Sequence, residues 1–184
     1  MPDPAPAAPP APWRIGLIGG EGSGKTTLAM ALAGALPACV VDESLRAFVE
    51  REGRTPRLDE QEALMRDQAA REDEAAALCR HPWLVADPAP LMTAVYSLLY
   101  FDDDTLVAPA VRHAAGYQLL VWCRPDVPWV PDGRQRDGSG QRDAADAIIG
   151  RLVREELAPR GIRVTGAEGD VDDRVAAVRR AWQR

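Results

Sequence analysis

A phosphate-binding loop is the clearest chemical signal in this sequence. Residues 19–26 read Gly-Gly-Glu-Gly-Ser-Gly-Lys-Thr, which completes the pattern G-x-x-x-x-G-K-[ST]. Lys25 is the only lysine among the 22 lysines and arginines of the chain. A compact ammonium fits inside a loop whose backbone N–H groups surround a polyphosphate, whereas a broad guanidinium does not fit easily. A lysine left by chance in an arginine-rich chain would not favour the position that the motif requires, so we expect Lys25 to bind phosphate.

The segments around this loop come in the order that a phosphate site requires. Residues 14–18 form an apolar run that predicts a buried parallel strand, and residues 26–33 predict a helix. The loop amides and the helix N-terminus would bind phosphate oxygens. Lys25 should reach the β- and γ-phosphates of ATP, and the Thr26 hydroxyl should ligate Mg²⁺. The expected ATP-binding residues are Gly19, Gly20, Glu21, Gly22, Ser23, Gly24, Lys25, Thr26 and Thr27.

Acidic residues follow the next two predicted strands. Asp42 and Glu43 come directly after the second apolar run of the chain, and Asp87 follows the third. Function gathers at the carboxyl ends of strands in a parallel sheet. Asp87 is therefore the first candidate to orient or deprotonate an acceptor hydroxyl and to hold Mg²⁺, and Asp42 is the second candidate on the acceptor side. Capping of the following helix is the alternative role for these acids.

Further side chains are candidates for binding the acceptor. Glu43 and Arg46 lie three residues apart and suit a polar substrate, with a surface ion pair as the alternative. Tyr100 lies four residues after Tyr96, a spacing that is more often found in a core. Trp129 lies between prolines, where it could stack on a flat ligand. The expected substrate-binding residues are Asp42, Glu43, Arg46, Tyr100, Trp129 and Asp132.

A segment rich in glycine and arginine, residues 131–142, follows the fourth predicted strand. Such a segment suits a mobile lid that closes on phosphate, and an arginine in it would neutralise charge on the transferred phosphoryl group. A solvated flexible loop is the alternative. Arg136 and Arg142 are the catalytic candidates in this segment, together with Lys25 and Asp87 elsewhere.

Apolar runs alternate with helical patterns along the chain, which predicts an α/β fold with a five-stranded parallel sheet and helices on both faces. The predicted strands cover residues 14–18, 38–41, 83–86, 117–122 and 162–164. The predicted helices cover residues 26–33, 44–52, 58–80, 91–101, 103–114, 143–157 and 171–182. In this arrangement the third strand ends close to the phosphate loop.

The composition predicts one domain without a nucleic-acid or membrane partner. The net charge of −6 gives no positive field for nucleic acid, and no apolar run approaches the length of a membrane span. Residues 1–12 are rich in proline and alanine and predict a disordered tail, which leaves 13–184 as the domain. Cys39, Cys79 and Cys123 lie far apart and within or beside apolar stretches. We expect buried free thiols and hence a cytoplasmic protein.

Four parts of the sequence match one known family. They are the phosphate loop 19–28, the pattern Glu43-x-x-Arg46-x-Phe48-Val49, the strand 84–87 with Thr93 and Tyr100 downstream, and, most specifically, Pro-Trp-Val-Pro-Asp-Gly at 128–133 with arginines behind it. In these features the chain resembles the ribosylnicotinamide kinase domain of the bacterial NAD-biosynthesis regulator, and related stand-alone P-loop kinases. The resemblance covers nearly everything after Trp13. It implies a P-loop NTPase fold and phosphoryl transfer from ATP to the 5′-hydroxyl of nicotinamide riboside, which gives nicotinamide mononucleotide.

The chain departs from this family's pattern after the third strand and in the lid. The family has Asp-Thr-Asp where this chain has Asp-Pro-Ala at 87–89, so the second acid is missing, and the lid arginines are shifted by one residue. The multifunctional relative also carries an adenylyltransferase domain with a His-x-x-His-type site. This chain cannot carry that site because its two histidines, His81 and His113, lie far apart.

We therefore expect an ATP-dependent kinase with a small-molecule substrate. The substrate is nicotinamide riboside or, alternatively, another nucleoside or small hydroxylated metabolite. An alternative from another class is a regulatory module that binds and slowly hydrolyses ATP without an acceptor.

Overall fold

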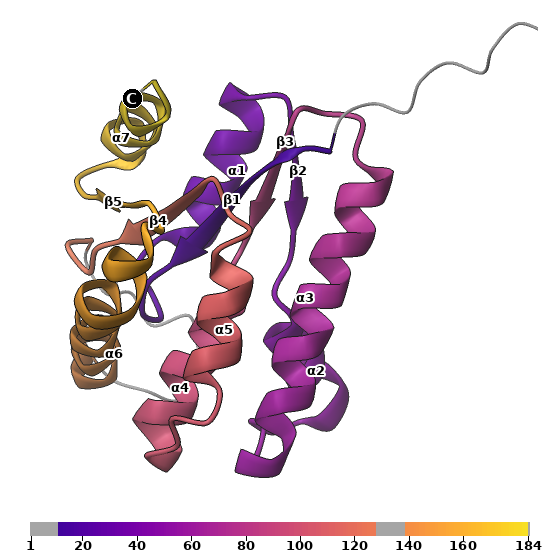
Figure 1. Cartoon of the computed structure of the whole chain (residues 1–184), viewed down its shortest axis with the longest axis vertical. Coiled ribbons are helices and arrows are strands. Elements are labelled where there is room, and N and C mark those ends of the chain that lie inside the picture. Colours follow the sequence, from indigo (N-terminus) through magenta and orange to yellow (C-terminus); the bar gives the residue numbers. More distant parts are fainter. Residues whose placement is uncertain (1–10, 128–138, 184) are drawn as a thin grey trace, which may run out of the picture.

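The computed structural model describes residues 11–127 and 139–183. In these residues five parallel strands form one sheet in the order β2-β3-β1-β4-β5 (Figure 1). The strands are β1 (Trp13–Ile18), β2 (Ala38–Val41), β3 (Trp83–Ala86), β4 (Leu119–Cys123) and β5 (Val164–Ala167). The central strand β1 pairs with β3 on one side and β4 on the other, so that Gly16 lies between Ala86 and Leu120. The predicted five-stranded parallel sheet is confirmed.

Helices cover both faces of this sheet (Figure 1). They are α1 (Lys25–Ala35), α2 (Ser44–Glu52), α3 (Gln61–Leu78), α4 (Leu91–Phe101), α5 (Val107–Ala114), α6 (Ser139–Leu152) and α7 (Val171–Trp182). On one face, Leu28 of α1 and Val178 of α7 share an apolar cluster with Leu17 of β1. On the other face, Met92 of α4 and Ile149 of α6 belong to a second cluster, to which α3 and α5 contribute. Among the described residues, no helix is long and apolar enough to cross a membrane.

The connections from β1 and β3 run to opposite sides of the sheet. The chain passes from β1 through α1 to the outer strand β2, and from β3 through α4 and α5 to β4 on the other side of β1. The crevice at the carboxyl ends of β1 and β3 is therefore the topological switch point, where ligands bind in open α/β sheets. The phosphate loop follows β1 and Asp87 follows β3, so both lie at this crevice.

Several element boundaries differ from those predicted by sequence pattern. Helix α5 begins at Val107 rather than at 103, because the carboxylate of Asp103 accepts hydrogen bonds from the hydroxyls of Ser97 and Thr105 and makes a turn there. Strand β5 covers Val164–Ala167 rather than 162–164, because the N–H of Ile162 donates to the carbonyl of Leu157, at the end of the helical segment Val153–Leu157, instead of to the sheet. Helix α6 begins at Ser139, inside the segment predicted to be a lid.

The prediction of three free thiols is wrong for two of them. Cys39 on β2 and Cys79, directly after α3, form a disulfide across 40 residues of sequence. Helix α3 packs beside β2, and this tertiary contact brings together two cysteines that sequence spacing leaves apart. Cys123 is the free cysteine, and burial raises the pKa of its thiol to about 11. The expectation of a reducing, cytoplasmic compartment rested on free thiols and loses that support.

Candidate active site

The loop between β1 and α1 has a shape that requires glycine. Gly24 adopts a positive φ of 82° and forms the N-cap of α1. A Cβ on Gly19 would lie 2.5 Å from the Ser23 hydroxyl oxygen and 2.6 Å from the carbonyl oxygen of Cys123. The loop therefore lies directly against the end of β4. Its N–H groups and those of the first turn of α1 form an anion-binding concavity.

Lys25 begins α1, and its side chain folds back over this loop. The Nζ atom donates to the carbonyl oxygens of Gly19 at 2.9 Å and of Gly20 at 3.0 Å. Thr26 and Thr27 follow in the first helical turn with exposed side chains. The loop thus presents one ammonium and an accessible Thr26 hydroxyl at the same helix end.

The described residues fit Mg²⁺ only as a metal shared with phosphate. No group of three or more His, Cys, Asp or Glu side chains among residues 11–127 and 139–183 could hold a metal ion. Mg²⁺ is commonly bound through one or two protein oxygens together with phosphate oxygens. The exposed Thr26 hydroxyl and the carboxylate of Asp87 meet that requirement.

Asp87 lies at the carboxyl end of β3 with 4% of its surface exposed. Its backbone N–H donates to the carbonyl of Val41 at 2.9 Å, which fixes it beside the end of β2. The N-cap of α4 is Pro90, so Asp87 does not cap that helix. Helix capping was the structural alternative to a functional role, and it fails here.

Glu43 occupies the N-cap position of α2, yet its side chain makes no capping hydrogen bond. The N–H of Ser44 donates instead to Oε1 of Gln68 on α3, at 2.8 Å. Burial raises the pKa of Glu43 above its usual value; the charge of Asp87 adds to this effect, whereas Lys25 and Arg46 oppose it. Lys25 and Asp87 are therefore near enough to Glu43, at the carboxyl edge of the sheet, for their charges to act on its pKa.

The other acceptor-side candidates are less closely associated with this group. Asp42 is exposed. Arg46 is close enough to act on the pKa of Glu43, but its side chain is also exposed. Tyr100 stacks on Tyr96 with ring centres 6.0 Å apart. It lies at the far end of α4, about 14 Å along the axis from Leu91 at the standard helical rise.

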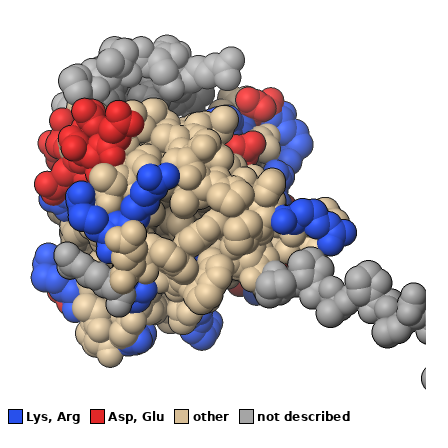
Figure 2. Space-filling view, turned by 90° about the horizontal axis from the view of Figure 1, so that it is seen from above, with Lys and Arg blue, Asp and Glu red and all other residues tan. Residues whose placement is uncertain are grey.

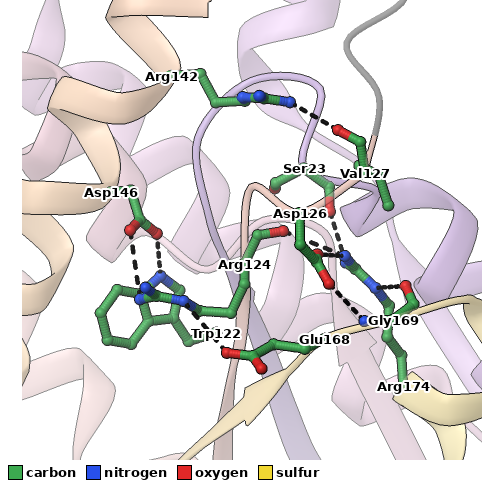
Figure 3. Close-up of polar contacts among 10 residues, drawn as sticks. All are labelled: Ser23, Trp122, Arg124, Asp126, Val127, Arg142, Asp146, Glu168, Gly169 and Arg174. Carbon is green, nitrogen blue, oxygen red and sulfur yellow. Dashed lines mark hydrogen bonds and ion pairs between the residues drawn. The ribbon is translucent and has the colours of Figure 1, made fainter.

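Arg142 of α6 packs against the phosphate loop at Gly20. Its Nη1 donates to the carbonyl of Val127 at 2.9 Å (Figure 3), and its own carbonyl lies 2.9 Å from the place of a Cβ on Gly20. Arg142 belongs to the first turn of α6 rather than to a loop, and whether the segment 131–142 acts as a lid stays a prediction. The candidates Trp129, Asp132 and Arg136 lie outside the described residues.

Two arginines that the sequence patterns did not single out lie beside this loop (Figure 3). The Cζ of Arg124 lies 4.0 Å from the ring centre of Trp122, and its guanidinium pairs with Asp146 at 3.3 Å and Glu168 at 3.7 Å. Arg174 of α7 is 2% exposed and donates to the carbonyl of Ser23 at 2.7 Å.

A sequence signal for Arg174 does exist. Residues 171, 174, 175 and 178 follow the i, i+3, i+4, i+7 spacing of a buried helix face, and three of the four are valine. An arginine at the remaining position places a charge among apolar side chains, and such a charge requires buried partners.

Ala89 stands where the resembled family has its second acid. It is 1% exposed, belongs to the apolar cluster beneath the sheet, and donates its N–H to the carbonyl of Leu17 at 2.9 Å. Its Cβ lies 3.0 Å from the place of a Cβ on Gly16. This position therefore contributes packing and no polar group to the crevice.

A separate depression lies at the amino ends of the strands, far from the phosphate loop. It has a volume of about 500 Å³, and its lining includes Trp13, Tyr117, Arg160, Arg163 and Trp182. Figure 2 looks onto this end of the molecule, where uncharged residues fill the middle of the view. The depression contains neither the glycine loop nor the acids Glu43 and Asp87, so we assign the chemistry to the carboxyl edge.

The comparisons with known proteins agree with this architecture. The sequence matches the AAA domain family over residues 14–174. A comparison with curated protein sequences finds no match.

Solved structures share the fold at low sequence identity. The NadR protein in complex with NR is 18% identical, with a TM-score of 0.72 over 92% of this chain, and the chain spans half of its length. Deoxyadenosine kinase from M. mycoides with bound dATP is 10% identical, with a TM-score of 0.62 over 94% of this chain and all of that one. Thymidylate kinase from Ehrlichia chaffeensis is 13% identical, with a TM-score of 0.63 over 95% of this chain and all of that one.

Proposed function

The chain belongs to the AAA domain family, and on that premise we propose that it is an ATP-dependent kinase that phosphorylates a small hydroxylated molecule. One observation carries the proposal: two acids at the switch point of the sheet, Asp87, which is buried, and Glu43, which is partly buried, lie near the phosphate loop, and the charge of its lysine acts on the pKa of Glu43. One acid beside the loop can serve the Mg²⁺ of a bound nucleotide, as in P-loop NTPases in general. A kinase also uses an acid to bind and orient the acceptor hydroxyl, and the second carboxylate is available for that role.

The residues divide into a donor side and an acceptor side. The loop N–H groups bind the phosphates of ATP, and Lys25 and Arg142 offset the charge of the transferred group, with Arg136 as a further candidate. Asp87 orients the acceptor hydroxyl and takes its proton as the oxygen attacks. Glu43 and Arg46 bind other polar groups of the acceptor, and Tyr100, Trp129 and Asp132 remain candidates for the same role.

Mg²⁺ is the metal that suits this site. Thr26 and Asp87 would hold it, and the ion would neutralise phosphate charge when bound. No other described side chains supply a metal cluster.

The acceptor that we propose is nicotinamide riboside, with transfer to its 5′-hydroxyl. The resemblance at the phosphate loop, at Glu43 and Arg46 and at the segment 128–133 supports it, as does the shared fold with a protein solved in complex with NR. Another nucleoside is the second candidate. It is favoured by the two kinases that match this chain along their full length, one with bound dATP and one a thymidylate kinase.

A panel of acceptors with Mg·ATP tests the proposal. Nicotinamide riboside, the common nucleosides and deoxynucleosides, and thymidine monophosphate would each be incubated with the protein, and ADP release and phosphorylated product would both be measured. We expect the highest kcat/KM for nicotinamide riboside. A higher value for a deoxynucleoside would reject this acceptor and retain the kinase. ADP release without any phosphorylated product would reject the kinase in favour of the regulatory ATPase.

Lys25→Ala is the control that ties any activity to the phosphate loop. Removal of one transition-state donor costs about 10²–10³ in kcat. We expect at least this loss with unchanged circular dichroism, and Lys25→Arg should not restore activity because a guanidinium does not fit the loop. An active Lys25→Ala protein would contradict a mechanism in which Lys25 stabilises the transferred phosphoryl group.

A further inference from the structure

Arg174 brings a guanidinium into the interior next to the phosphate loop. It projects from the first turn of α7 and is 2% exposed, next to Val175 and one turn before Val178 on the same helix face. A guanidinium stays charged in proteins, so its burial is tolerated only when its donors find acceptors. Every acceptor it uses belongs to a loop at the carboxyl edge of the sheet.

Three strand-end loops meet at this side chain (Figure 3). Nη1 donates to the carbonyl of Ser23 in the phosphate loop at 2.7 Å, and Nη2 donates to the carbonyl of Arg124 after β4 at 3.2 Å. Nε donates to the carbonyl of Gly169 after β5 at 3.0 Å, and the Asp126 carboxylate closes the arrangement by pairing with Nη2 and accepting the N–H of Gly169.

The contact between Arg174 and Ser23 also fixes the direction of the Gly24 N–H. The carbonyl of Ser23 and the N–H of Gly24 belong to one planar trans peptide unit and point in opposite directions. Because Arg174 holds the carbonyl on the α7 side, the Gly24 N–H is turned away from α7. The guanidinium also packs against Gly24, since a Cβ there would lie 3.4 Å from Nη1.

We propose that Arg174 is a positioning residue for the phosphate donor: it orients the Ser23–Gly24 peptide so that the Gly24 N–H donates to a bound phosphate, and it holds the loops after β4 and β5 against the phosphate loop. The proposal rests on the proposed function only in requiring that the loop binds nucleotide phosphate. It assigns Arg174 no direct contact with the acceptor.

Arg174→Lys and Arg174→Met test this role, with Arg179→Met as a matched control. Arg179 lies on the same helix and donates to the carbonyl of Ala35, at the other end of α1 from the phosphate loop. We expect Arg174→Met to raise the Kd of Mg·ADP and the KM of ATP about tenfold, as for the loss of one charge-assisted contact, without changing the KM of the acceptor. Arg174→Lys should recover part of the affinity, and Arg179→Met should leave it unchanged.

The amide of Gly24 gives a readout that loss of stability alone would not change. In ¹⁵N-labelled protein, its resonance should shift downfield when Mg·ADP is added to the wild type, and by less in Arg174→Lys at saturating ADP. A folded Arg174→Lys or Arg174→Met protein with wild-type ADP affinity and a wild-type Gly24 shift would overturn the proposal. Failure of the proposed function would look different: ADP would bind and the Gly24 amide would shift, yet no acceptor would be phosphorylated.

Discussion

At the scale of single residues, the proposed site contains two acids that make no helix-capping hydrogen bond. Glu43 is the N-cap residue of α2, but its side chain makes no capping hydrogen bond, and the first N–H of the helix, that of Ser44, donates to Gln68. Asp87 precedes α4 without capping it. Both carboxylates are therefore available to a ligand at the crevice. Their burial lowers the stability of the folded protein.

That cost gives Glu43 a measurable pH signature. Burial raises its pKa above 4.5, so the folded protein binds more protons than the unfolded chain once the pH passes 4.5. The contribution of Glu43 to the free energy of unfolding therefore falls as the pH rises from 4.5 to the raised pKa, and it stays constant above that pKa. We expect Glu43→Gln to be more stable than the wild type at neutral pH, with the difference vanishing below pH 4.5, as measured by Tm between pH 4 and 8.

The neighbouring acid Asp42 supplies the comparison for this prediction. It is exposed, so Asp42→Asn should not stabilise the protein at neutral pH as Glu43→Gln does. If Glu43→Gln has a lower Tm than the wild type at pH 7, the prediction that the buried carboxylate of Glu43 destabilises the folded protein is wrong. The stabilised variant should also bind the acceptor more weakly, as expected where a site trades stability for function.

At the scale of elements, the α2–α3 contact positions Glu43, which belongs to the proposed acceptor side. Gln68 is 4% exposed and joins the middle of α3 to the first N–H of α2, which directly follows Glu43. The long helix α3 thus sets where α2 begins, and with it the place of the acid. Neither helix contributes to the phosphate loop, so the donor and acceptor sides have separate supports.

This separation predicts a selective effect for Gln68→Ala. Loss of a buried hydrogen bond at a helix start costs about 1–2 kcal/mol. Because the start of α2 becomes less fixed, we expect the KM of the acceptor to rise several-fold while the KM of ATP stays constant. Gln61→Ala is the matched control, since Gln61 is a buried glutamine on the same helix whose contact is with Pro56. It should lower Tm without changing either KM, and an equal rise in both KM values for Gln68→Ala would contradict the separation.

At the scale of the whole molecule, the disulfide links the edge strand β2 to the end of α3, the helix that positions the start of α2 and Glu43. Cys39 lies on the outer strand β2, and Cys79 ends α3. The closed loop between them contains all of α2 and α3. Constraint of this loop in the unfolded chain therefore stabilises the part of the fold that carries Glu43.

Reduction of this disulfide should destabilise the protein by about 2–4 kcal/mol, as expected from chain entropy for a loop of 40 residues. Thermal melts with and without dithiothreitol measure the effect as a lower Tm. The Cys39→Ser/Cys79→Ser protein should melt at the temperature of the reduced wild type and show no response to dithiothreitol. If dithiothreitol leaves the Tm of the wild type unchanged, the disulfide does not stabilise the protein as predicted.

Sequence pattern predicted the parts of this protein that depend on neighbours in the chain. The glycine loop required a strand before it and a helix after it, and both are present at Trp13–Ile18 and Lys25–Ala35. Uninterrupted apolar runs predicted strands because a parallel sheet is buried on both faces. Boundaries failed where a side chain such as Asp103 bonds to its own loop, since such bonds compete with helix formation.

Sequence alone determined the phosphate loop and the α/β class, because a loop's backbone shape and a strand's periodicity are local properties. Tertiary structure decided which acids were released from capping, that Cys39 meets Cys79, that Ala89 faces the core, and that Arg174 reaches Ser23 across 151 positions. These are contacts between segments far apart in the chain. They depend on how helices pack on the sheet, and no local pattern specifies that packing.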